Sequence, residues 1–132
     1  MFNRTLSAVT IGLALSLAAA GRAAAQEMSR QHPKGTQRTI SGTVVDVSCM
    51  FGLGLSGNDH RMCAQVCAGK GIPLAVLGDD GTLYLPTSAA MPGDGQNARL
   101  KDFAEQPVTV TGVVFPAGGA QAIQIAAIRR KA

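Results

Sequence analysis

The sequence has few aromatic residues: four phenylalanines, one tyrosine and no tryptophan in 132 residues. Proteins that bind single-stranded nucleic acid stack the bases on aromatic side chains in a basic groove. Here the only run of basic residues is 129–131, at the C-terminal end. The sequence also lacks Gly-x-Ser-x-Gly and a phosphate-binding glycine loop. These absences argue against a nucleic-acid partner, a serine hydrolase and a phosphate-loop nucleotide-binding enzyme.

The first 25 residues have the three parts of a secretory signal peptide. Arg4 supplies a positive charge, residues 6–20 are almost wholly apolar or small, and residues 23–25 are the small residues that signal peptidase recognises. The apolar run is shorter than the roughly 20 residues of a membrane-spanning helix, and no cysteine follows it to carry a lipid. We therefore expect cleavage after Ala25, export to the periplasm or the medium, and no stable membrane insertion afterwards.

The chain beyond residue 25 is long enough for one small domain. Loss of Arg4 and Arg22 leaves ten basic and eight acidic residues, so the net charge falls from +4 to +2. Residues 26–37 are polar, contain Pro33 and Gly35, and are predicted to form a flexible leader. Residues 38–132 are predicted to be a single domain.

Five segments have the composition and alternation of β-strands, at residues 39–47, 73–77, 82–86, 107–115 and 120–128. Gly42 interrupts the first of them, where a bulge or strong bend is expected. Asp80-Gly81 between the second and third predicts a hairpin. The last two strands, joined by Pro116-Ala117-Gly118-Gly119, are predicted to form another.

Two helices are predicted between the strands. Residues 60–68 contain no helix breaker, Asn58 or Asp59 is a suitable N-cap, and Gly69 is well placed to end the helix. A short helix is predicted at residues 98–105. The resulting order of elements is that of the OB-fold barrel. We therefore predict a mainly β protein with a five-stranded OB-like barrel, and an open β-sandwich or sheet with two packed helices as the alternative.

The candidate functional residues are three cysteines and one histidine: Cys49, His60, Cys63 and Cys67. A helical residue advances about 100° around the axis, so the last three fall within an arc of about 60°. Arg61 and Gln65 lie opposite and are expected to face water. Cys49 ends the first strand. The glycine-rich segment 49–57 is predicted to be a loop that brings the Cys49 side chain to the face of the helix that carries His60, Cys63 and Cys67.

Asp46 and Asp59 lie close to these residues in the sequence. They are expected to act as turn and cap residues, or to orient the imidazole of His60 as a hydrogen-bond partner outside the ligand set.

Three cysteines and a histidine are a ligand set for tetrahedral zinc, and thiolates with imidazole also suit copper(I). The alternative is a structural disulfide from Cys49 to either Cys63 or Cys67, as exported domains often contain. A bond between Cys63 and Cys67 is less favourable, because their side chains leave the helix nearly parallel. Either pairing leaves one cysteine unpaired. Thiol–disulfide exchange is the weakest interpretation, because the sequence has no Cys-x-x-Cys.

Three motifs within residues 42–73 occur in series: Val-Asp-x-x-Cys at 45–49, His-x-x-Cys-Ala-x-x-Cys at 60–67, and Gly-x-Pro at 71–73. This series resembles that of a group of small exported bacterial proteins with a β-rich C-terminal half, and the resemblance implies an exported small β-domain. The sequence as a whole predicts an exported binding domain whose cluster holds zinc or copper(I). The alternative is a disulfide-stabilised module that is structural or binds an exported protein partner.

Overall fold

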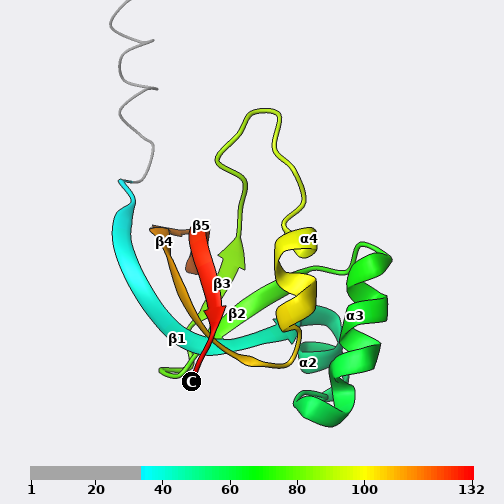
Figure 1. Cartoon of the computed structure of the whole chain (residues 1–132). Helices are drawn as coiled ribbons and strands as arrows, with labels where there is room; N and C mark the ends of the chain where they lie inside the picture. Colours follow the sequence, from blue (N-terminus) through cyan, green and yellow to red (C-terminus); the bar gives the residue numbers. More distant parts are fainter. Residues whose placement is uncertain (1–33) are drawn as a thin grey trace, which may run out of the picture. The chain divides into compact units, whose positions relative to one another are not determined.

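The computed structural model describes residues 34–132 (Figure 1). The predicted signal peptide and most of the predicted leader lie outside the described residues. The elements are, in chain order, β1 (Thr36–Asp46), α2 (Val47–Leu53), η1 (Asn58–His60), α3 (Arg61–Gly69), β2 (Leu74–Gly78), β3 (Leu83–Pro86), α4 (Asn97–Leu100), η2 (Lys101–Phe103), β4 (Pro107–Ala117) and β5 (Ala120–Arg130).

The five strands close into a barrel in the order β1-β2-β3-β5-β4. Neighbouring strands are antiparallel, except that β3 and β5 run parallel. The cysteine-bearing helices are inserted between β1 and β2, and the short helical segment lies between β3 and β4. The closed barrel confirms the predicted OB-like fold, and the open sandwich or sheet is excluded.

Strand β1 is long and strongly curved because its two ends pair with different strands (Figure 1). Residues 36–43 pair with β4, and residues 42–46 pair with β2. Gly42 lies at the junction, opposite Gly78, where a Cβ atom would be 2.9 Å from the Gly78 Cα. A side chain at this position would push the two strands apart, so glycine permits the bend that the sequence predicted. Strand β1 begins at Thr36, two residues inside the segment predicted to be a flexible leader.

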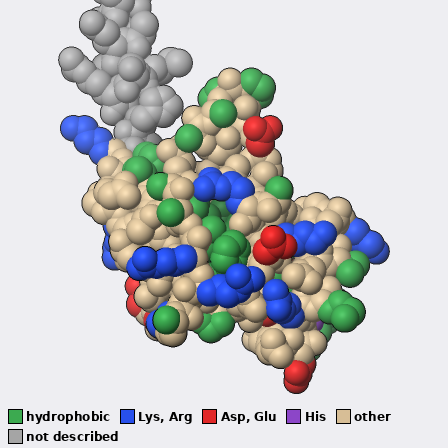
Figure 2. Space-filling model, in the orientation of Figure 1, with side chains coloured by type: hydrophobic (Ala, Val, Ile, Leu, Met, Phe, Trp, Pro, Cys, Tyr) green, Lys and Arg blue, Asp and Glu red, His purple; other side chains and the backbone are tan. Residues whose placement is uncertain are grey.

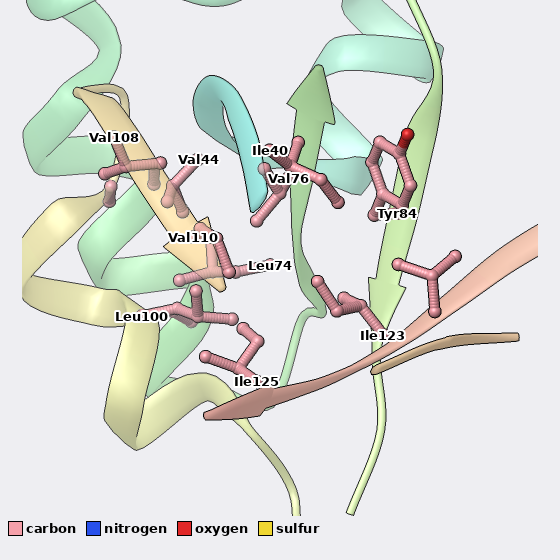
Figure 3. Close-up of a cluster of buried hydrophobic side chains, with 14 residues drawn as sticks. Ile40, Val44, Leu74, Val76, Tyr84, Leu100, Val108, Val110, Ile123 and Ile125 are labelled. Carbon is pink, nitrogen blue, oxygen red and sulfur yellow. The ribbon is translucent and has the colours of Figure 1, made fainter. Parts of the chain in front are cut away.

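The interior of the barrel is filled by aliphatic side chains and one tyrosine (Figure 3). All five strands contribute to it, with Ile40, Val44, Leu74, Val76, Tyr84, Val108, Val110, Ile123 and Ile125. Leu100 of α4 is fully buried in the same cluster, so α4 covers the interior on the side where α2 and α3 also lie (Figure 1). Among the described helices, none is long and apolar enough to cross a bilayer.

The helix predicted at residues 98–105 is present but shorter and less regular. A single turn of α-helix, α4, is followed by the 3₁₀ turn η2, which ends at Phe103. Glu105 then adopts a left-handed backbone conformation, with φ of 57°. A helix cannot continue through this conformation, so the chain reverses into β4.

Candidate metal centre

Cys49 lies in a helix rather than in the loop predicted for residues 49–57. Helix α2 begins directly after β1, because the Asp46 side chain caps it: Oδ1 accepts a hydrogen bond from the Cys49 N–H at 2.9 Å. The helix ends at Gly54, whose positive φ of 66° glycine adopts without strain. Asp46 is therefore the residue that turns the end of a strand into the start of a helix.

The helix predicted at residues 60–68 begins at Arg61, so it carries Cys63 and Cys67 while His60 ends the preceding 3₁₀ turn. Asn58 and Asp59 belong to the 3₁₀ turn η1, and neither caps the helix through its side chain. Asp59 is exposed and belongs to neither of the groups of candidate ligands that the described residues form. The expected role of Asp59 as cap or imidazole partner has no support in the structure.

The helical wheel predicted that Arg61 and Gln65 face water, but both are half-buried. Arg61 Nη2 donates to the Asp102 carbonyl at 3.1 Å, and Gln65 Nε2 donates to the Lys101 carbonyl at 3.2 Å. Both bonds attach α3 to η2. The wheel could show that these residues lie opposite the cysteines, but not that another segment covers that side.

Cys49, Cys63 and Cys67 form a sulfur triad. Their Sγ atoms all lie within 4.8 Å of one another, and all three thiols are free. Four-coordinate zinc with Zn–S bonds of about 2.3 Å holds its sulfur ligands about 3.8 Å apart. Small side-chain rotations would therefore bring the triad to metal-binding distances. Cys49 is buried, Cys67 is partly buried and Cys63 is exposed, so the triad opens to the surface at Cys63.

His60 belongs to a second group, the mixed triad of Asp46, Cys49 and His60. One ligand atom from each of these residues lies within 4.8 Å of the other two. The four predicted ligands are thus divided between two triads that share Cys49. Asp46, which was expected to serve as a cap or to orient the imidazole, both caps α2 and lies among the candidate ligands.

Two polar atoms of the mixed triad are buried without a partner. Asp46 is fully buried, and its Oδ2 receives no hydrogen bond from an N–H or O–H group; His60 is 9 % exposed, and its Nε2 has no hydrogen-bond partner. Nearly all buried polar atoms in folded proteins have a partner, so an exception calls for an explanation. A metal ion ligated by these two atoms would provide one.

The buried carboxylate of Asp46 controls the acidity of the nearby thiols. It raises the pKa of Cys67 to about 12, chiefly because the protonated thiol donates a hydrogen bond to the carboxylate, and burial adds to this effect. Burial first, and then the charge of Asp46, raises the pKa of Cys49 above its ordinary value. Without a metal, both thiols are therefore protonated at neutral pH, and a metal ion has to displace their protons.

Glu105, which follows η2, supports the site from a distant part of the chain. Its Oε1 accepts from the Asp46 N–H at 3.3 Å, and its Oε2 accepts from the Gly57 N–H at 2.8 Å. Glu105 is 4 % exposed, and its backbone φ is positive. Sequence reasoning missed Glu105, because it lies 59 positions from Asp46 and no local motif marks it.

Exposed apolar side chains lie close to the site along the chain and on its helices. Phe51 and Leu53 of α2 are 68 % and 69 % exposed, and Met62 of α3 is 78 % exposed. Figure 2 shows apolar side chains at the surface in the region of α3, with lysine and arginine side chains also on this face.

Comparison with protein-family models, with curated proteins and with solved structures finds no match to this chain.

Proposed function

We propose that this protein is an exported small domain that binds zinc or copper(I) through the thiolates of Cys49, Cys63 and Cys67. The observation that carries the proposal is the sulfur triad, whose atoms come from two helices and meet within 4.8 Å. Thiolates are ligands for zinc and for copper(I). The export signal predicted at residues 1–25 would bring the domain to a compartment where metal ions reach it from outside the cytoplasm.

A metal ion explains more of the site than a disulfide does. A bond between any two cysteines would leave the third thiol unpaired. Metal binding instead uses all three thiols, as thiolates. The disulfide-stabilised module remains the alternative function, but a disulfide gives no partner to Asp46 Oδ2 or His60 Nε2.

The neighbourhood of Asp46 favours zinc over copper(I). Copper(I) is satisfied by two or three soft sulfur ligands, whereas zinc also accepts imidazole nitrogen and carboxylate oxygen. The site contains all three ligand types within one buried region. Zinc is therefore the first metal to test.

The test is metal binding by the reduced protein, residues 26–132, followed by native mass spectrometry and competition with a chelator. We expect zinc to bind, and Cys67→Ser to weaken the binding at least about 100-fold, because it removes a direct ligand. Ser48→Ala is the matched control, since Ser48 is an exposed residue of α2 beside Cys49, and it should bind like the wild type. Protein that binds neither zinc nor copper(I) after reduction, and whose mass before reduction shows the loss of two hydrogens, would support the disulfide module instead.

A further inference from the structure

We propose that the site holds two metal ions, with the Cys49 thiolate bridging them. One ion is bound by the sulfur triad, and the second by Asp46, Cys49 and His60. This inference rests on the proposed function and adds to it a second position, whose carboxylate, thiolate and imidazole ligands suit zinc.

The geometry provides the first support. Cys49 is the one residue common to the two triads, and it is the most buried of the three cysteines. Its Sγ lies within 4.8 Å of the sulfur atoms of Cys63 and Cys67, and within the same distance of ligand atoms from Asp46 and His60. A thiolate has more than one lone pair, so one sulfur can bind an ion on each side.

The hydrogen bonds provide the second support. Asp46 Oδ1 is occupied by the Cys49 N–H, while Oδ2 is buried and has no N–H or O–H donor. His60 Nε2 is also buried and unpartnered. An ion held only by the three sulfurs would leave both atoms unsatisfied, whereas a second ion bound through Oδ2 and Nε2 would give both of them a partner.

Charge provides the third support. Three thiolates and the Asp46 carboxylate carry four negative charges when the thiols are deprotonated. Within residues 34–132 the one salt bridge joins Lys131 to Asp79, so no lysine or arginine is paired with the Asp46 carboxylate. One zinc ion leaves two negative charges in a largely buried site, and two zinc ions neutralise it. Uncompensated charge is strongly disfavoured in such a site.

The experiment is titration with zinc alone, read by native mass spectrometry. We expect two zinc ions in the wild type, one in Asp46→Asn, one in Cys63→Ser and none in Cys49→Ser. Asparagine also caps helices, so Asp46→Asn keeps the bond to the Cys49 N–H and the start of α2. Asp59→Asn removes the same charge from an exposed residue outside both triads, and it should retain two ions.

X-ray absorption of the zinc-loaded protein provides a second measurement. Two ions on one sulfur, each at about 2.3 Å, are separated by no more than about 4.6 Å. A zinc–zinc distance in this range in the wild type, and its loss in Asp46→Asn, would support the bridge. A single zinc in the wild type, unaffected by Asp46→Asn, would overturn the two-ion model and leave the proposed function standing. Absence of any bound zinc or copper(I) would overturn both.

Discussion

The barrel and the helical insertion between β1 and β2 are stabilised in different ways. The barrel interior is a continuous cluster of large aliphatic side chains, many with no exposed surface. The insertion contributes only Ala64 and Ala68 to that cluster, and several of its large apolar residues are exposed. The fold therefore depends on apolar burial, whereas the position of the candidate site depends on polar contacts.

These polar contacts reach the insertion from the segment between β3 and β4. Asn97 Nδ2 donates to the carbonyls of Ala68 and Ile72, and Asn97 Oδ1 accepts from the Leu74 N–H. Glu105 binds the backbone at both ends of the α2 region. The same short segment thus holds the start and the end of the insertion, and supplies Leu100 to the barrel core.

The largest effect is expected from a change in the barrel. Leu100→Ala should lower the free energy of unfolding by about 2–5 kcal/mol, because it leaves a cavity in a fully buried cluster. The loss, measured by urea unfolding, should be similar with and without zinc. Leu85→Ala, at a partly exposed position in β3, is the control and should cost much less. A loss at Leu100 as small as that at Leu85 would contradict a core that is continuous through α4.

A smaller effect is expected where the two regions meet. Glu105→Gln should lower the free energy of unfolding by about 1–3 kcal/mol, because an amide nitrogen would face one of two buried N–H donors. Zinc binding should weaken as well, since both bonds position the α2 region. Asp102→Asn changes an exposed charge nearby and should alter neither quantity. If Glu105→Gln lowers stability without changing zinc affinity, the insertion holds its shape independently of the barrel.

The smallest effect is a pH dependence confined to the insertion. The pKa of Cys67 is raised to about 12 in the folded protein, from an ordinary value of 9.0. Between these values the unfolded chain has lost a proton that the folded metal-free chain retains, so stability should fall as pH rises from 9 towards 12. Urea unfolding at increasing pH should show this fall in the wild type and a shallower one in Cys67→Ser. Equal slopes would show that Asp46 does not control this thiol.

Much of the barrel could be predicted from the sequence, because strand alternation and turn chemistry are local signals. Asp80-Gly81 and Gly118-Gly119 marked the two hairpins, and Gly42 marked the bend in β1. Helix α2 could not be predicted, because it overlaps the segment 49–57, whose three glycines are typical of a loop. Its start depends on one hydrogen bond that the Asp46 side chain accepts from the Cys49 N–H, at the end of a strand whose register is set by distant partners.

The sequence by itself determined which residues are available to bind a metal and that Cys63 and Cys67 share one face of a helix. Helical periodicity fixes that face, whereas His60 ends the 3₁₀ turn η1 before the helix and is grouped with Asp46 rather than with the sulfur triad. Only the tertiary structure decided that Cys49 joins two triads, that Asp46 is fully buried among them, and that Glu105 supports the site. Those relationships depend on contacts between segments far apart in the chain, and the closed barrel is what brings these segments together.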